Sequence, residues 1–448
     1  MNRGSALAVL GAAQLLIALD HNIVYVALPD ITRALGFVAG AEQWVVSAYA
    51  LGFGGFLLAG GRITDAVGPR RAFIAALAVH GAAAAAGGIA GSREALIAAR
   101  AAQGIGSALL FPATLACLSL AFTGPDRVRA LAVWGAAGAC GGAFGSLLGG
   151  VLTDALGWRS VLLCGVAPAV LAGAGAVRTL PRDGGHAVGA ARQAPAAAAG
   201  TAAATFAVLT LAQGLTAGWS PTAMAGSAAA AGVAFVLFRR LEARAADPLV
   251  PVAVLRRREV AAATILAFAF MAAFGGQFYL LTVQLQDVAR LGALAAGAAF
   301  LPLTLAILVG TQLGGRLTAG QGPLRAALIG FGLGAAGLAA CGIAVLHDSL
   351  LALGLAMVVD GLGQGIAWTG MWALVAAGPR GDAGVATGLV ATSQQLGGAA
   401  GLAVWVALPA PAVGLLLAGG AALSAAAVAA HVMTRVAAGS APTGPHRV

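Results

Sequence analysis

The chain of 448 residues contains no lysine, and only 9% of its residues are charged. Soluble domains carry about 25% charged residues, so too few are present here to cover a soluble surface. Without lysine there can be no Walker A loop, and we do not expect ATP to drive this chain directly. The four cysteines all lie in apolar runs, which indicates neither a disulfide nor a metal site. No cofactor site and no set of nucleophile and base is indicated, so the sequence does not predict an enzyme.

What the chain does contain is apolar: 60% of the residues are hydrophobic and the mean hydropathy is +0.93. Backbone groups in lipid must form their hydrogen bonds within the protein, and runs this long leave no room for a sheet, so we predict an all-α polytopic membrane protein. At about 20 residues per span, we count fourteen candidate transmembrane helices. They lie at 6–28, 43–61, 72–91, 95–122, 130–153, 160–180, 199–218, 222–240, 260–286, 293–315, 325–347, 350–377, 384–408 and 411–433.

The arginines predict the orientation of these helices. With the N-terminus inside, twenty arginines fall in cytoplasmic segments or at the cytoplasmic ends of spans, four fall in outer segments, and Arg100 alone lies well inside a span. This bias fits the positive-inside rule and predicts that both termini are cytoplasmic. The net charge of +10 comes from these dispersed arginines, so it favours membrane topology over a nucleic-acid partner.

One charged loop occurs twice. GGRITDAVGPRR at 60–71 returns 254 positions later as GGRLTAGQGPLR at 314–325, with Ala319 in the position of Asp65. Secondary transporters are built from such internal repeats. Six candidate helices precede the Pro/Gly/Ala-rich stretch 181–198, and six follow the arginine-rich stretch 239–258. We therefore predict a first six-helix bundle at 1–180, a linker with two additional helices at 181–258, a second bundle at 259–435 and a cytoplasmic tail at 436–448.

Several motifs occur in a characteristic order and spacing. They are Leu19-Asp20-His-Asn-Ile-Val-Tyr-Val-Ala27-Leu28-Pro29, Gln43-Trp44-Val-Val-Ser-Ala-Tyr49, Gly61-Arg-Ile-Thr-Asp65-Ala-Val-Gly68-Pro-Arg70-Arg71, Arg100-Ala-Ala-Gln103-Gly104-Ile-Gly106, and Gln284-Leu-Gln286 with Gly297 and Pro302. Together they resemble the fourteen-helix drug:proton antiporter branch of the major facilitator superfamily, over nearly the whole chain. The resemblance implies two six-helix bundles plus an inserted pair, in the plasma membrane of a bacterium. One departure is Ser146, which stands where the fifth helix of these antiporters usually has a proline.

Three ionisable residues within spans are candidates for proton coupling: Asp20, Arg100 and Asp360. A charge inside the bilayer costs about 2.5–3.5 kcal/mol on insertion scales, and such residues usually face a cavity or a partner. Helix rise places Asp20 about 13 Å and Arg100 about 9 Å below the outer edge, so the two can meet. A static pair that holds two helices together is the structural alternative. Asp360 is predicted to be a second proton site, a binding site for a cationic substrate, or a hydrogen-bonded structural acid.

Two further groups of residues are expected to act around these charges. The substrate cavity is predicted to include Gln103, Gln277, Tyr279, Gln284, Trp368, Trp372 and Gln394, although aromatic residues at such spacing also serve in helix packing. A cytoplasmic gate is predicted at Gly61, Arg62, Asp65, Gly68, Arg70 and Arg71, where the alternative is that the arginines only set topology.

The resemblance and the buried acids predict proton-coupled export of amphipathic organic compounds, such as drugs or antibiotics, by alternating access. The expected partners are the small-molecule substrate, protons and the lipid bilayer, with no nucleic acid, and the protein is expected to be a monomer. Two alternatives stay open: a proton symporter that imports a metabolite, suggested by Ser146, and a membrane receptor that transports nothing.

Overall fold

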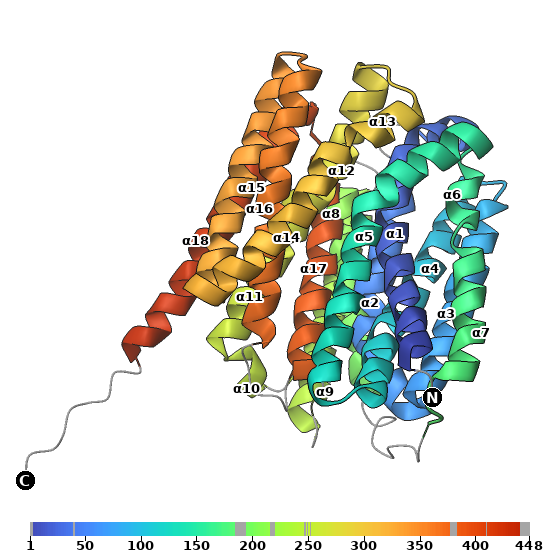
Figure 1. The fold of residues 1–448 in the computed structure, drawn as a ribbon, viewed down its shortest axis with the longest axis vertical. Helices are drawn as coiled ribbons and strands as arrows, with labels where there is room; N and C mark the ends of the chain where they lie inside the picture. The colour runs from blue at the N-terminus through green and yellow to red at the C-terminus, as the bar shows by residue number, and fades with distance from the viewer. Residues whose placement is uncertain are drawn as a thin grey trace, which may run out of the picture.

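A computed structural model describes residues 3–38, 41–183, 194–215, 220–245, 248, 250, 252–376, 383–408 and 410–439. These residues form helices and the turns between them, with no strand in the described ranges. The helices run alternately up and down the long axis (Figure 1). We call the end where the first helix begins the proximal end, and the opposite end the distal end.

The first half of the chain forms one bundle of antiparallel helices. Its elements are α1 (Arg3–Leu35), η1 (Ala41–Gln43), α2 (Trp44–Val67), α3 (Pro69–Gly88), α4 (Arg93–Ala121), α5 (Gly124–Leu156), α6 (Arg159–Leu163) and α7 (Val166–Thr179). The turn from α2 to α3 is made by Gly68, whose φ of 97° is open to glycine and strained for other residues. Pro69 then occupies the first turn of α3, where its missing N–H costs nothing.

The second half repeats this plan. Its elements are α10 (Val252–Leu255), α11 (Arg258–Phe270), η3 (Met271–Gly275), α12 (Gly276–Thr282), η4 (Val283–Val288), α13 (Ala293–Ala299), α14 (Leu301–Gln321), α15 (Pro323–Leu346), α16 (Leu350–Ala376), α17 (Ala383–Val406) and α18 (Pro411–Gly439). Gly322 with φ 87° precedes Pro323, so the turn of the first bundle recurs in the second copy of the charged loop. The segments η3 and η4 are π-helical, a departure that the sequence did not predict.

Two helices between the bundles have no counterpart in either half. They are α8 (Ala194–Leu215) and α9 (Pro221–Arg244), and they pack against each other. Helix α8 also contacts α2 of the first bundle and α17 of the second. Its Thr201 hydroxyl donates a hydrogen bond to the carbonyl oxygen of Gly55. Helix α8 therefore lies along the seam between the bundles, and α9 covers its outer side.

Each of the fourteen predicted runs overlaps a helix of the structure. Within the described ranges, nine helices are long and apolar enough to cross a membrane, and two bent pairs raise the number to eleven. The all-helical fold is therefore confirmed, while the count of fourteen spans and the cytoplasmic termini stay predictions. Residues 184–193 of the predicted linker and 440–448 of the predicted tail lie outside the described residues.

The two bundles pack together at their distal ends. The Tyr25 ring stacks on the Phe278 ring with centroids 6.0 Å apart. The Tyr279 hydroxyl donates to Glu42 Oε1 at 3.0 Å, and Gln286 Nε2 donates to the Val26 carbonyl oxygen at 2.8 Å. One apolar core runs through the distal part of α1 and into the second bundle. The structure is therefore closed on the distal side.

Candidate functional site

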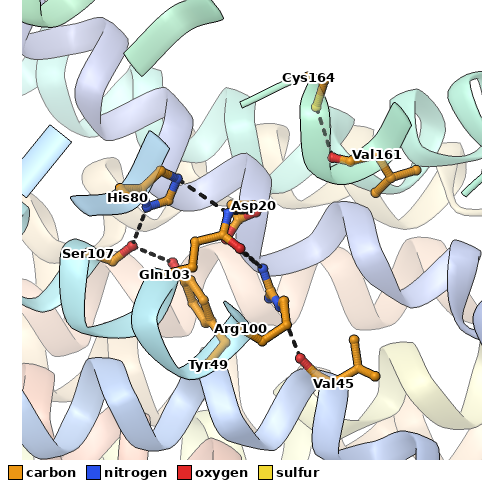
Figure 2. Close-up of polar contacts among 9 residues, drawn as sticks. All are labelled: Asp20, Val45, Tyr49, His80, Arg100, Gln103, Ser107, Val161 and Cys164. Atoms are coloured by element: carbon orange, nitrogen blue, oxygen red, sulfur yellow. Dashed lines mark hydrogen bonds and ion pairs between the residues drawn. The ribbon is translucent and has the colours of Figure 1, made fainter. Parts of the chain in front are cut away.

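Asp20 and Arg100 form a buried ion pair between α1 and α4 (Figure 2). Arg100 Nη1 lies 2.9 Å from Asp20 Oδ2, and the side chains are 1% and 5% exposed. The helix-rise argument, which placed both residues at similar depth, is confirmed by this contact. A charged pair is stable in such a place only when further hydrogen bonds complete it.

Gln103, one turn along α4, completes the pair. Its Oε1 accepts from Arg100 Nη1 at 2.8 Å, and its Nε2 donates to Asp20 Oδ1 at 2.7 Å. Arg100 also donates from Nε to the Val45 carbonyl oxygen at 3.0 Å, and its guanidinium lies 4.4 Å from the centroid of the Tyr49 ring. Gln103 was predicted to line the substrate cavity, and the structure places it in the charged cluster instead.

The sequence did not single out His80 on α3, which belongs to the same network. Its ring is fully buried, and Nε2 lies 3.5 Å from Gln103 Nε2. Nδ1 lies 3.0 Å from the hydroxyl of Ser107, which also accepts from the Tyr49 hydroxyl at 2.9 Å. His80 lies in an alanine-rich run with no polar neighbour in sequence, so only the packing of α3 on α4 reveals its role.

Asp360 lies in the middle of α16 and is fully buried within the second bundle. Gln364, one turn further, donates from Nε2 to Asp360 Oδ2 at 3.0 Å. Gln277 of α12 lies beside the carboxylate without completing a hydrogen bond to it. Asp360 Oδ1 and both amide atoms of Gln277 have no hydrogen-bond partner in the described part of the chain. Asp360 therefore has no arginine as a partner in the way that Asp20 has Arg100. Its hydrogen-bonding neighbour is the amide of Gln364.

The other predicted cavity residues fall into two groups. Trp368 is 37% exposed, and its ring centroid lies 5.7 Å from that of Trp372 and 5.5 Å from that of Phe270. These aromatic rings form one patch on the second bundle. Gln277, Gln284 and Gln394 are instead buried, and Tyr279 is part of the distal closure. The structure therefore does not gather all seven predicted residues around one space.

The predicted gate has an additional acid that the motif does not contain. Asp183, just after α7, accepts hydrogen bonds from the backbone N–H groups of Arg70 and Arg71 at 2.9 and 3.1 Å. Its carboxyl group lies against Gly68, where any side chain would collide with it. Asp65 lies 3.9 Å from Arg62 with a side chain that is 59% exposed. In this conformation Asp183, rather than Asp65, binds the start of α3.

A cavity of about 440 Å³ lies at this proximal corner. It is lined by Arg70, Arg71, Ile74, Arg182 and Asp183. Gly61 has open space where a side chain would project. Asp183 was missed because it falls in the stretch that the sequence analysis assigned to a linker.

The repeated bundles and the buried charges define a polytopic membrane protein of the secondary-transporter class. Comparison with known proteins agrees. The sequence model of the Major Facilitator Superfamily matches residues 10–402, and the chain belongs to that family. With its apolar helices and bacterial relatives, it is a multi-pass protein of the bacterial plasma membrane.

Two relatives show how close the match is. The cephamycin export protein CmcT of Amycolatopsis lactamdurans is 36% identical over 408 residues, which cover 89% of this chain and 84% of that protein. The puromycin resistance protein pur8 of Streptomyces alboniger is 36% identical over 405 residues, covering 89% and 80%. These relatives confirm the family that the motifs predicted.

A solved structure supports the fold alone. A POT family transporter in complex with 5-aminolevulinic acid matches with a TM-score of 0.73 at 14% identity, over 96% of each chain. The similarity extends through both bundles and the pair of helices between them, since it covers nearly all of the chain.

Proposed function

We propose that this protein exports amphipathic, antibiotic-like compounds across the plasma membrane in exchange for protons. The observation that carries this proposal is the buried pair of Asp20 and Arg100, because an ionisable pair sealed between membrane helices is costly unless it is used. Relatives named for cephamycin export and puromycin resistance support the class of substrate. The protein is a transporter and catalyses no covalent reaction.

Asp20 is the residue that takes up the proton. While it is ionised, it holds Arg100 and Gln103 on α4. A proton arriving from outside neutralises it and removes the charge attraction to Arg100, which loosens α1 from α4. Moving one charge down a membrane potential supplies about 2.3 kcal/mol per 100 mV, comparable to the strength of such a buried contact.

Substrate enters from the proximal side, because the bundles are joined at the distal end in this conformation. Trp368 and Trp372 offer aromatic faces to a planar or cationic compound, with Gln394 as a polar group on α17. Rocking of the bundles then breaks the distal contacts and closes the proximal side. Arg62, Asp65, Arg70 and Arg71 act there as the gate, with Gly61 and Gly68 giving the loop its shape.

Asp360 serves as a second proton site. Asp360 Oδ1 and the Gln277 amide have no hydrogen-bond partner among the described residues, so they are the groups that would bind a proton or a water molecule here. Tyr279 belongs to the distal closure, which must open for release, and Gln284 is buried in the adjoining segment η4.

For the whole chain we propose fourteen spans with both termini in the cytoplasm, in a monomer surrounded by lipid. The boundaries are those of the sequence analysis: bundles at 1–180 and 259–435, joined by 181–258, and a tail at 436–448. The arginine bias and the repeat support this arrangement.

An export assay in an efflux-deficient bacterial host tests the proposal. Cells that express the protein should tolerate higher concentrations of puromycin or a cephamycin than cells with the empty vector. Cells that express Asp20→Asn should be as sensitive as the empty vector, with equal protein in the membrane. Uptake of these compounds instead of export would show symport and overturn the proposal.

A further inference from the structure

His80 lies at the centre of a chain of hydrogen bonds that crosses four helices. The chain runs from Asp20 on α1 to Gln103 on α4, to His80 on α3, back to Ser107 on α4 and finally to Tyr49 on α2. Figure 2 shows the ring between the Gln103 amide and the Ser107 hydroxyl. All five residues are buried, with whole-residue exposures between 0% and 4%. Water therefore cannot replace a lost partner freely, and the direction of each hydrogen bond matters.

With Asp20 ionised, the positions of the hydrogens follow from the partners. The Gln103 Oε1 must accept from Arg100, and the Gln103 Nε2 must donate to Asp20. The second hydrogen of that amide nitrogen then points toward His80 Nε2, which has to accept it. His80 is therefore neutral and carries its proton on Nδ1, from which it donates to Ser107.

Protonation of Asp20 reverses this order. The new O–H of Asp20 needs an acceptor, and of the two side chains that hydrogen-bond to Asp20 in the structure, Arg100 and Gln103, only Gln103 can offer one, by turning its amide over to present Oε1. The same oxygen then faces His80 Nε2, so the ring must carry its proton on Nε2 and accept from the Ser107 hydroxyl at Nδ1. The amide nitrogen now faces Arg100 Nη1, donor against donor, and Arg100 loses this acceptor.

We infer that Gln103 and His80 form a hydrogen-bond switch that passes the protonation state of Asp20 to Ser107 and Tyr49. The ring holds one proton in both states, so the transported proton is the one on Asp20 and His80 is a positioning residue. The titratable or charged groups around the ring and its hydrogen-bond partners are Asp20 and His21 from α1, Tyr49 from α2, Arg100 from α4 and Cys164 between α6 and α7. The His21 ring lies beside Tyr49, with centroids 6.1 Å apart, and has no hydrogen bond to the His80 ring among the described residues. The thiol of Cys164 is directed to the Val161 carbonyl oxygen and does not compete for the ring.

This switch connects the proton site to α2, which packs on both sides of the seam between the bundles. Tyr49 belongs to α2, and α2 contacts α8, the helix along the seam, and α17 of the second bundle. The Arg100 guanidinium lies over the Tyr49 ring, and the Tyr49 hydroxyl is bonded to Ser107. Loss of the Asp20–Arg100 attraction and the new hydrogen-bond direction at Ser107 therefore both act on the Tyr49 side chain. The inference rests on the proposed function in one respect, that Asp20 is the group that becomes protonated.

The tautomer of His80 can be observed directly on the purified full-length protein, labelled with ¹⁵N-histidine, without any substrate. The chain has six histidines, and His80→Gln identifies the resonances of the ring in question. At about pH 8, where histidine is ordinarily neutral, the wild-type ring should carry its proton on Nδ1. In Asp20→Asn it should carry its proton on Nε2. The single oxygen of the asparagine stays with Arg100, because that bond is charge-assisted, and its NH₂ group then turns Gln103 over.

Asp126→Asn is the matched control, because Asp126 pairs with Arg3 near the proximal end and its substitution should leave the His80 tautomer unchanged. Ser107→Ala removes the acceptor of Nδ1 and should weaken the wild-type preference. A wild-type ring protonated on Nε2, or the same tautomer in wild type and Asp20→Asn, would overturn the inference. Failure of the proposed function would be recognised by a different measurement: Asp20→Asn would still export the drug, whatever the tautomer of His80.

Discussion

Gln103 on α4 and Asp360 on α16 occupy equivalent positions in the two halves of the chain. Each is followed by a Gly-x-Gly, and the first of these glycines packs against the carbonyl oxygen of Tyr49 in one half and of Leu303 in the other. Tyr49 and Leu303 are 254 positions apart, the spacing of the two loop copies. In the first half the carboxylate is on the first helix and the amide on the fourth. The second half has the carboxylate on the fourth helix and the amide, Gln277, on the first.

Because of this exchange, the Asp360 carboxylate has fewer hydrogen-bond and charge partners than the Asp20 carboxylate. Asp360→Asn should raise the free energy of unfolding by about 1–2 kcal/mol, because it removes a buried charge and brings an amide to the unpartnered Gln277. Thermal unfolding in detergent measures the change. Asp287→Asn, at an exposed position, is the control and should change nothing. A large loss of stability would show that Asp360 is a structural acid.

The helices and the meeting of Asp20 with Arg100 could be predicted because helix rise and apolar length fix depth along the membrane axis. The direction in which a side chain faces around its helix depends on the packing of neighbours. For this reason Gln103 was assigned to a cavity, and His80 was not noticed. Asp183 was out of reach for another reason: its partners are backbone N–H groups 112 and 113 positions away. No pattern in the sequence marks such a contact.

The contact of Asp183 with α3 predicts a difference between two acids of the gate. Asp183→Ala should lower the free energy of unfolding by about 1–3 kcal/mol, because its buried carboxylate binds the backbone at the start of α3. Asp65→Ala should lower it by less than about 0.5 kcal/mol, since its ion pair with Arg62 is long and exposed. Equal effects of the two substitutions in thermal unfolding would contradict this assignment of the proximal contact.

The distal closure depends on a close approach of α5 to α13. A side chain at Gly297 would lie 2.7 Å from the carbonyl oxygen of Ser146, which is too close for any residue larger than glycine. Gly297→Leu should therefore push the bundles apart at the distal end. Spin labels on cysteines introduced at the exposed positions Leu156 and Leu294, in a background without the native cysteines, measure the distance across this contact.

The expected result is a longer mean distance in Gly297→Leu than in the parent protein. Gly226→Leu on α9 is the control, because nothing lies within 4 Å of a Cβ atom added at this position. The label-to-label distance in this variant should match that in the parent protein. An unchanged distance in both variants would mean that this glycine does not govern the closure.

Proton-driven transport in reconstituted vesicles tests the central role of Asp20 most directly. Vesicles with an imposed pH gradient should accumulate puromycin when they contain the wild-type protein. With Asp20→Asn they should accumulate none against the gradient, yet still exchange labelled for unlabelled puromycin, because the bundles can rock without a proton. Gradient-driven accumulation by Asp20→Asn at the wild-type rate would contradict the account.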